Sequence, residues 1–384
     1  MTNPDGGPTM PRRFITATAL ALAGGSGLEG AALAQAAPPP PIVISAQSAM
    51  TTWLTTREAT LQCDGQPIQA LYAEPLAPQV TAAAPDAGLQ PSTQALRFSI
   101  NAEGRPRSIR PAPAASPRFL QTDESQAALA AYRFAPGQAR ADCAMTIRLT
   151  PRPLAEASRE QLAFAYAVDG ARPAAIVQRL AREGDDCRER PHPAVAVYPS
   201  RDAGRPPAGG RAWSVTRWNV GRDGRTSDVE TLASSGHDAF DAEARRVVIA
   251  STFQPDAPRR GCINAWTRAG ETLLDTPEPE PTDDPLKNCP AELRARFTHG
   301  RLIYPHAFQQ RGIEGWAIVR YDIASWGETG AIEVLEAQPA AAFGEAARNI
   351  IRASRATPGH VAGIRCTDRI IFRLPRGDER PNTD

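Results

Sequence analysis

The chain has 384 residues, a length that suits two or three domains of ordinary size. Its 43 basic and 42 acidic side chains nearly cancel, so no charge excess indicates binding to nucleic acid or to an anionic membrane surface. The hydrophobic content of 42% can fill ordinary cores despite the 37 prolines, and we therefore expect folded modules joined by Pro-rich linkers.

Residues 1–36 have the features of a signal peptide. Two arginines precede an apolar run over residues 14–23, and Ala34-Gln35-Ala36 supplies the small residues that a signal peptidase accepts. Glycines and then Glu29 interrupt the apolar run, which is shorter than the ~20 residues that span a bilayer. We predict an exported chain that is cleaved after Ala36 and has no stable membrane insertion. A retained membrane anchor is the alternative.

A common skeleton recurs three times along the rest of the chain. In each copy a short strand runs into a turn glycine, an Ala-rich segment ends at a proline, and a cysteine follows seven or eight positions later. The turn glycines are Gly104, Gly224 and Gly330, and the prolines are Pro136, Pro255 and Pro358. The agreement of three features in one frame predicts three copies of a single unit.

The first strand of each copy alternates apolar and polar residues, which gives its sheet one apolar face. The apolar trios are Leu96, Phe98 and Ile100, then Thr216, Trp218 and Val220, then Val319, Tyr321 and Ile323. The residues between them, among them Arg97, Arg217 and Arg320, are expected to face solvent. The following helices carry apolar stripes: Phe240, Ala244 and Val247, and then Phe343, Ala347 and Ile350. We predict an α+β fold in which a helix covers one face of each sheet.

Six cysteines constrain the organisation further, because an even number in an exported chain favours disulfides. Six cysteines allow 15 pairings, and the repeat symmetry selects one of them. The predicted pairs are Cys63–Cys143, Cys187–Cys262 and Cys289–Cys366. A metal site is the competing interpretation, but no two cysteines have C-x-x-C spacing and the five histidines are scattered. We therefore expect no metal and no other cofactor.

Changes in composition set the expected boundaries. Module 1 spans residues 37–150, module 2 spans 151–270 with a helical lead-in, and module 3 spans 286–375. A Pro-rich linker covers residues 271–285, and residues 376–384 form a tail that we expect to be disordered. These module names are kept below.

Module 3 carries a specific combination of short motifs. They are Tyr304-Pro305-His306-Ala307, Arg311-Gly312-Ile313-Glu314-Gly315, the alternating strand 316–323, Pro358 after the helix, and the final strand 369–374. With these motifs the module resembles a TonB C-terminal domain, the periplasmic receptor-binding module of the TonB energy transducers. The resemblance is clearest over residues 289–375 and extends more weakly to modules 2 and 1, as three divergent copies.

The resemblance implies modules of about three antiparallel strands with helices packed on one face. In the family, the last strand lies near a sheet edge and captures an extended peptide of an outer-membrane transporter by strand addition. The corresponding edge here is Asp368, Arg369, Ile370, Ile371, Phe372, Arg373 and Leu374. The hairpin loop that contains Trp326 is a possible further binding element. The expected location is the periplasm, and the expected partner is a TonB-dependent receptor peptide or another envelope protein.

Two features depart from the energy transducers of the family. The hydrophobic segment looks cleavable, and the Pro-rich spacer after it is short. Force cannot be transmitted from the inner membrane without an anchor, so we expect a soluble relative that binds peptides or proteins, linked to TonB-dependent outer-membrane transport. The alternative is an envelope structural or peptidoglycan-binding factor with no transport role.

No motif in the sequence favours an enzyme. His237 lies near Asp238 and Asp241, but Asp238 is better interpreted as a helix N-cap, and neither G-x-S-x-G nor H-E-x-x-H occurs. Trp213 and Trp316 occupy matching positions on the outward side of their strands, where packing between repeats is the favoured explanation and partner binding the alternative. We therefore expect no catalytic residues.

Overall fold

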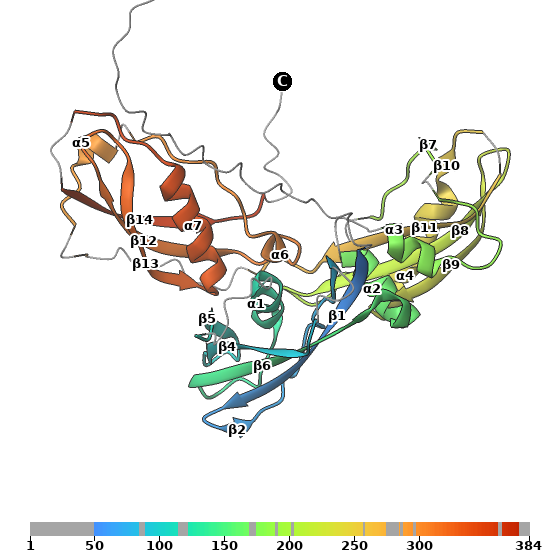
Figure 1. Cartoon of the computed structure of the whole chain (residues 1–384), viewed down its shortest axis with the longest axis horizontal. Helices are drawn as coiled ribbons and strands as arrows, with labels where there is room; N and C mark the ends of the chain where they lie inside the picture. Colours follow the sequence, from blue (N-terminus) through green and yellow to red (C-terminus); the bar gives the residue numbers. More distant parts are fainter. Residues whose placement is uncertain are drawn as a thin grey trace, which may run out of the picture. The chain divides into compact units, whose positions relative to one another are not determined.

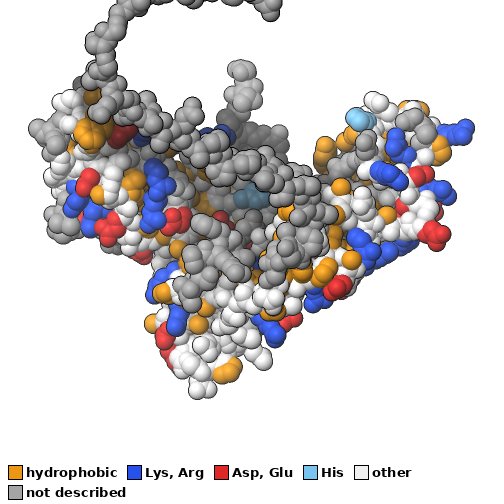
Figure 2. All heavy atoms as spheres, viewed as in Figure 1, with side chains coloured by type: hydrophobic (Ala, Val, Ile, Leu, Met, Phe, Trp, Pro, Cys, Tyr) orange, Lys and Arg blue, Asp and Glu red, His pale blue; other side chains and the backbone are white. Residues whose placement is uncertain are grey.

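The computed structural model describes residues 50–83, 89–113, 122–168, 174–188, 191–200, 203–255, 258–273, 284, 287–294, 297–359 and 363–375. The predicted signal peptide, the predicted tail and most of the predicted linker lie outside these ranges. The described residues belong to one compact unit of helices and small antiparallel sheets, which confirms the α+β class (Figure 1). None of the described helices is both long and apolar enough to cross a bilayer. Acidic and basic side chains are interspersed over the face seen in Figure 2.

Module 1 is built on a six-stranded antiparallel sheet. The strand order is β2-β1-β6-β4-β5, and β3 pairs with the start of β1. The strands are β1 (Thr51–Cys63), β2 (Gln66–Pro67), β3 (Gln79–Ala83), β4 (Ser92–Ile100), β5 (Pro106–Pro111) and β6 (Arg140–Pro153). Helix α1 (Thr122–Ala131) buries Ala127, Ala128 and Leu129. The module has more strands than the three expected, because the segment before its central hairpin also joins the sheet.

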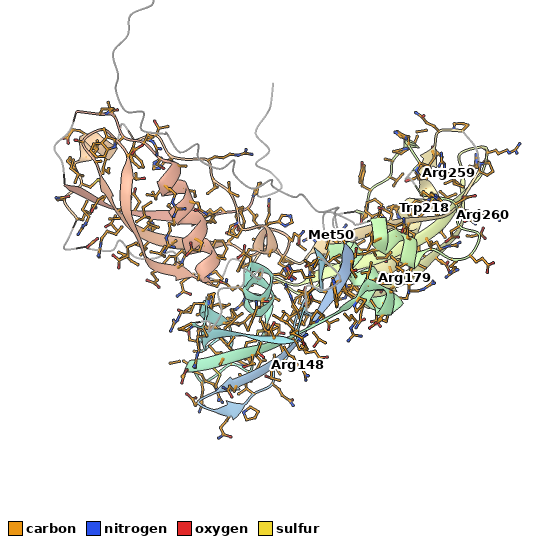
Figure 3. The ribbon with its side chains drawn as sticks, viewed as in Figure 1. Met50, Arg148, Arg179, Trp218, Arg259 and Arg260 are labelled. Atoms are coloured by element: carbon orange, nitrogen blue, oxygen red, sulfur yellow. A yellow bond between two sulfur atoms is a disulfide. The ribbon has the colours of Figure 1, made fainter. Side chains whose placement is uncertain are left out.

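Module 2 has a three-stranded sheet of order β11-β8-β9. Its elements are η1 (Leu154–Glu156), α2 (Arg159–Val168), α3 (Ala174–Leu180), β7 (Pro193–Val195), β8 (Arg211–Val220), β9 (Thr226–Ser234), α4 (Asp238–Ala250), β10 (Thr252–Phe253) and β11 (Arg259–Ala269). Trp218, labelled in Figure 3, packs with Val248 of α4 on one face of the sheet. Val215 and Ile263 pack with α2 and α3 on the other face. Helices therefore cover both faces of this sheet.

Module 3 also has a three-stranded sheet, of order β13-β12-β14. Its elements are α5 (Ala291–Arg294), α6 (His306–Gln309), β12 (Gly315–Ile323), β13 (Thr329–Gln338), α7 (Ala341–Ala353) and β14 (Ile364–Phe372). Helix α7 lies along the sheet (Figure 1) and buries the predicted stripe of Phe343, Ala347 and Ile350. The helix that covers the apolar face is therefore the one that the sequence periodicity predicts.

The alternation predicted for the first strands is confirmed, because all three apolar trios are buried. The expectation of solvent exposure holds for Arg97, whose side chain is 50% exposed. It was wrong for Arg217 and Arg320, which bind the carboxylates of Asp185 and Asp284, respectively. Both carboxylates belong to the segments that precede their sheets and pass over this face. The strand pattern alone does not indicate that these segments approach the arginines.

The turn glycine recurs with one geometry, but its third member is Gly327 and not the predicted Gly330. Gly104, Gly224 and Gly327 have φ angles of 75°, 76° and 95°, a region that favours glycine. A Cβ on each would collide with the carbonyl oxygen of Phe134, Phe253 or Ala356, respectively. Gly330 lies inside β13, and a Cβ there would meet open space. The sequence Trp326-Gly-Glu-Thr-Gly330 holds two glycines, and only the contact with Ala356 distinguishes them.

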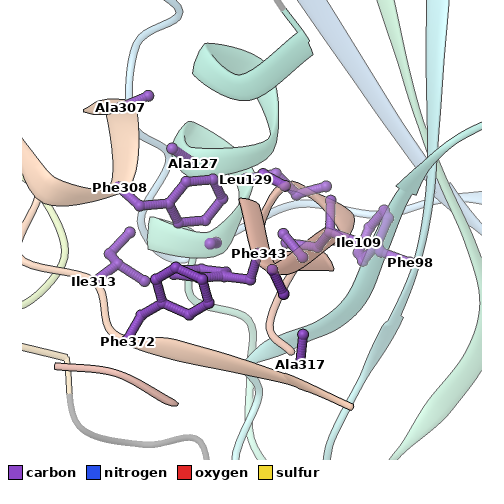
Figure 4. Close-up of a cluster of buried hydrophobic side chains, with 14 of the residues drawn as sticks. Phe98, Ile109, Ala127, Leu129, Ala307, Phe308, Ile313, Ala317, Phe343 and Phe372 are labelled. Atoms are coloured by element: carbon purple, nitrogen blue, oxygen red, sulfur yellow. The ribbon is translucent and has the colours of Figure 1, made fainter. Parts of the chain in front are cut away.

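Modules 1 and 3 share one hydrophobic core. Figure 4 shows Phe308 of α6 beside Ala127 of α1, with Phe343 and Phe372 of module 3 below them. The backbone also joins the two modules, because the Ile109 amide donates to the Pro339 carbonyl at 2.9 Å. Module 2 has two clusters of its own, one of which includes Leu54 from β1. The modules therefore pack on one another within the compact unit.

The three disulfides are Cys63–Cys143, Cys187–Cys262 and Cys289–Cys366, the pairs that the repeat symmetry predicts. Each one joins the segment before the central hairpin of a module to the last long strand of its sheet, namely β6, β11 or β14, and in module 1 that segment is strand β1. The disulfides therefore hold equivalent positions in the three modules.

Candidate functional site

Strand β14 is the outermost described strand on its side of the module 3 sheet. It pairs with β12 in unbroken antiparallel register from Gly315↔Phe372 to Ile323↔Ile364, and β13 lies on the other side of β12 (Figure 1). The strand ends at Phe372, so Arg373 and Leu374 of the predicted edge lie beyond it. The Leu374 amide donates to Glu314 Oε1 at 2.8 Å and ties the following chain to the start of β12.

Two side chains of the predicted edge hold β14 on its own module. Phe372 is fully buried, and its ring centroid lies 5.2 Å from that of Phe343 on α7 and 5.8 Å from that of Tyr304. Asp368 accepts a hydrogen bond from the Tyr321 hydroxyl at 2.5 Å. These side chains position the strand, so they are not where a partner's side chains would dock.

The backbone of β14 supplies the groups that strand addition uses. On the side away from β12, the Arg365 carbonyl accepts a hydrogen bond from the Asn288 amide at 3.0 Å. Successive residues of an antiparallel strand direct their N–H and C=O groups to opposite sides. Thr367, Arg369 and Ile371 therefore direct theirs to the same side as Arg365.

The comparisons with known proteins identify this sheet. Residues 300–374, which contain β12, β13, α7 and β14, match the family model described as Gram-negative bacterial TonB protein C-terminal. Module 3 is a TonB C-terminal domain. The solution NMR structure of the Pseudomonas aeruginosa TonB CTD is similar at 26% identity and a TM-score of 0.19, and the match covers 23% of this chain and 92% of that chain. No curated protein matches the chain.

The motifs behind the resemblance have structural roles in this TonB C-terminal domain. The Tyr304 hydroxyl donates to the Ile313 carbonyl at 2.8 Å, which links the YP motif to the entry of β12. A Cβ at Gly315 would collide with the Gln338 carbonyl and with the Phe343 ring. The glycine therefore allows α7 and β13 to approach the start of β12 closely.

A half-exposed charge pair also holds the first residues of β14 in the TonB C-terminal domain. Arg365 Nε donates to Asp322 Oδ1 on β12 at 2.7 Å, and a second nitrogen donates to Oδ2 at 3.0 Å. This bidentate hydrogen bonding, together with the positive charge, lowers the pKa of Asp322 below its ordinary value. The pair connects the two strands next to the Cys289–Cys366 disulfide.

Trp326 lies in the turn between β12 and β13 of the TonB C-terminal domain. Its side chain is 65% exposed, and its Nε1–H donates to Glu328 Oε2 at 3.1 Å. Glu328 lies 3.8 Å from the guanidinium of Arg355. The indole is therefore held by its own turn, and a binding role for Trp326 stays a prediction.

The prediction for the start of α4 was wrong by one residue. His237 is the N-cap, and its side chain makes no capping hydrogen bond, whereas Asp238 is the first helical residue. Asp241 accepts a hydrogen bond from the Ser234 hydroxyl at 2.6 Å, which is a structural contact between α4 and β9. Over the described ranges, no group of three or more His, Cys, Asp and Glu side chains is placed to hold a metal ion.

Trp213 and Trp316, which occupy matching positions in modules 2 and 3, are buried, with 6% of each exposed. Trp213 stacks on Phe164 of α2 with ring centroids 5.0 Å apart. This contact lies within module 2, between its sheet and its helical lead-in, and not between repeats as expected. The sequence did not predict that this helix returns to the second face of the sheet.

Sequence reasoning missed a buried ion cluster formed by Glu74, Glu124, Arg211 and Arg311. Arg311, which precedes β12 and is fully buried, donates to both carboxylate oxygens of Glu124 at 2.6 and 3.0 Å. Arg211 at the start of β8 donates to Glu124 at 3.2 Å. Glu74 accepts a hydrogen bond from the Tyr72 hydroxyl at 2.8 Å and lies 3.7 Å from Arg311. One module supplies the acids and the other two supply one arginine each.

The cluster is electrically balanced, which makes its burial tolerable. Burial alone would raise the pKa of Glu124, but the guanidinium groups of Arg311 and Arg211 outweigh that effect and hold its pKa at about 2. Arg311 was the only residue of this cluster that belonged to a recognised sequence motif, R-G-I-E-G. Its acid partners lie in module 1, so no local pattern could have indicated them.

Proposed function

We propose that module 3 binds an extended peptide of a TonB-dependent outer-membrane transporter along the edge of β14. The main support is that β14 is the outermost described strand on one side of its sheet and lies within the residues that match the TonB C-terminal family. Strand addition takes its affinity from main-chain hydrogen bonds. This mode of binding needs few specific side chains from β14. It therefore suits a strand whose Phe372 and Asp368 side chains already contact other residues of module 3.

The proposal also treats modules 1 and 2 as divergent copies of the same domain. The shared turn glycine and the equivalent disulfides support it. Modules 2 and 3 share further details, because the Ser251 and Ser354 hydroxyls each donate to the carbonyl four residues earlier at 2.7 Å. Thr226 and Thr329 each donate to the last turn of the following helix, to Val248 and Ile351, respectively.

The proposed location is the periplasm, reached through the predicted signal peptide. The family is periplasmic, and three disulfides suit an oxidising compartment. A cleaved signal would leave the chain without the inner-membrane anchor of an energy transducer. The proposed role is therefore peptide binding linked to transport, without transmission of force.

Proline substitution on the edge tests the proposal. The Ile371 amide points away from β12, so Ile371→Pro removes an edge donor and leaves the ladder to β12 intact. A lost backbone hydrogen bond costs about 0.5–1.5 kcal/mol and the ring also obstructs the neighbouring strand, so we expect binding to weaken at least about tenfold. Calorimetric titration of the mature chain with synthetic peptides from the periplasm-facing N-termini of the organism's transporters gives the measurement.

Ile371→Val is the matched control, because it keeps the amide and most of the side chain. Equal melting temperatures of the two variants would show that the proline does not unfold the module. Equal peptide affinities of both variants and the unsubstituted chain would contradict the proposal. Cosedimentation with purified peptidoglycan, together with no transporter peptide bound, would favour the envelope structural alternative.

A further inference from the structure

We infer that the sheet of module 1 binds a zwitterionic amino-acid group on the face opposite helix α1. Arg148 of β6 binds the carboxylate of this ligand, and Glu58 of β1 binds its ammonium group. The site lies in another module than β14, so the inference does not depend on the proposed function.

The two faces of the module 1 sheet differ in character. Met145, Ile147 and Leu149 of β6 are buried in the core to which α1 contributes. Thr146 and Arg148 alternate with them along the strand, so their side chains lie on the opposite face. That face is therefore polar in the middle of the sheet.

A depression of about 410 Å³ lies on this polar face. Side chains of three neighbouring strands and of the residue before β4 line it, among them Glu58, Thr60, Pro91, Thr93, Thr146 and Arg148. Sites for small ligands have volumes of roughly 300–1,000 Å³. The depression is therefore large enough for a small ligand.

The strand register places the polar side chains in two rows. Arg148 is paired with Glu58 on one side and with Thr93 on the other. Thr146 is paired with Thr60 in the next row. Residues directly opposite each other on antiparallel strands share a face and lie about 5 Å apart. The first row therefore presents a carboxylate, a guanidinium and a hydroxyl side by side.

The two charged side chains of this row are not used by the fold. Glu58 and Arg148, the latter labelled in Figure 3, are exposed, and their side chains form no ion pair or hydrogen bond with any described residue. Opposite charges do pair elsewhere on the same face, because Arg97 lies 3.1 Å from Asp142. Both charged groups of the depression are therefore available to a ligand.

This combination of groups matches the head group of an α-amino acid. A guanidinium binds a carboxylate through two parallel hydrogen bonds, and the neighbouring Thr93 hydroxyl can donate a third. The Glu58 carboxylate can accept from an ammonium group, and Thr60 on the same strand offers a further acceptor. An anion would be repelled by Glu58 and a cation by Arg148, so only a ligand with both charges satisfies both side chains.

A titration followed by NMR tests the inference on the mature chain with its disulfides intact. The probe is leucine, whose apolar side chain can pack on Pro91, and the signals are the Thr93 and Thr146 amides. We expect a Kd on the order of 1 mM, as suits a shallow site. Unchanged signals at about 20 mM leucine, which is well above that Kd, would overturn the inference.

Two leucine derivatives test the role of each ligand charge. N-acetylleucine lacks the ammonium group and leucine amide lacks the carboxylate, so each should bind at least about threefold more weakly than leucine. Equal affinities for the three compounds would contradict a zwitterion site. A muropeptide that ends in diaminopimelate carries the same head group. Tighter binding of the muropeptide than of leucine would identify the cell wall as the source of the ligand, and weaker binding would identify free amino acids.

Two substitutions assign the partner of each charge. Arg148→Gln should bind leucine and leucine amide equally, because the contact to the carboxylate is lost, and Glu58→Gln should bind leucine and N-acetylleucine equally. Both positions are exposed, so the melting temperature should stay unchanged. Arg97→Gln is the matched control, since Arg97 lies on the same face but does not line the depression, and it should bind leucine as the unsubstituted chain does. Undiminished discrimination by Arg148→Gln and Glu58→Gln would overturn the assignment, whether or not a transporter peptide binds at β14.

Discussion

Glu124 on helix α1 accepts two hydrogen bonds from Arg311, which lies 187 positions later in the chain, at 2.6 and 3.0 Å. The pair joins module 1 to the residue that leads into β12 of the TonB C-terminal domain. The same carboxylate also accepts a hydrogen bond from Arg211 at 3.2 Å. Glu124 therefore connects all three modules.

Replacement of Arg311 by methionine should destabilise the chain strongly. Arg311→Met leaves Glu74 and Glu124 buried with Arg211 as the one remaining arginine of the four-residue cluster, and breaking a buried pair typically costs about 3–5 kcal/mol. Urea unfolding followed by circular dichroism gives the change. The control is Arg348→Met, whose partner Glu345 is 61% exposed, and it should cost less than about 1 kcal/mol. Similar losses in the two variants would contradict a special role for the cluster.

Stability should fall in acid through Glu124. Its pKa is about 2 in the folded chain, below the ordinary value of 4.5, so folding favours the charged form. This contribution is fully present above pH 4.5 and is lost as the pH falls toward 2, and it amounts to about 3 kcal/mol. Urea midpoints measured between pH 6 and pH 2 test this. Glu124→Gln should have a lower urea midpoint at pH 6, and its midpoint should change less between pH 6 and pH 2. A pH dependence equal to that of the unsubstituted chain would rule out Glu124 as the titrating group.

The two glycines of the β12–β13 turn should differ in their response to alanine. Gly327→Ala places a Cβ against the Ala356 carbonyl at a φ of 95°, so we expect a loss of about 1–3 kcal/mol. Gly330→Ala places its Cβ in open space and should change stability by less than about 0.5 kcal/mol. Thermal melts of the two variants provide the comparison. Equal losses would mean that the turn does not depend on the contact with Ala356.

Removal of one disulfide should weaken the domain that it closes. Cys289 and Cys366 are 77 positions apart, and a closed loop of that length contributes about 4 kcal/mol in the chain-entropy description. The double variant Cys289→Ser with Cys366→Ser should therefore unfold at a markedly lower urea concentration. The comparison variant replaces Cys187 and Cys262, which are 75 positions apart and close a loop of nearly the same length in module 2. An unchanged urea midpoint in both variants would show that the disulfides do not stabilise the modules by restricting the unfolded chain.

Local periodicity was sufficient to predict much of the fold. The trios such as Val319, Tyr321 and Ile323 are buried as their alternation predicts, and the stripe from Phe343 to Ile350 faces the sheet. The repeat frame also predicted the disulfide pairs, because equivalent cysteines occupy equivalent places in each unit. The candidate edge was predicted as a segment, although its last two residues lie beyond the strand.

Other features depend on segments that return from far along the chain. Arg217 and Arg320 looked exposed because their partners Asp185 and Asp284 lie in the lead-in segments, outside the strand pattern. The choice between Gly327 and Gly330 depended on a contact with Ala356, which a turn motif does not contain.

The sequence by itself determined the repeating unit, its apolar faces, its disulfides and the family of its last module, because these properties follow from spacing within one unit. Only the tertiary structure decided which charges are buried. The buried charges depend on packing between units, because Glu124 of module 1 meets Arg311 of module 3 across a long sequence separation. No local pattern encodes such encounters, since they form only when distant segments fold onto one another.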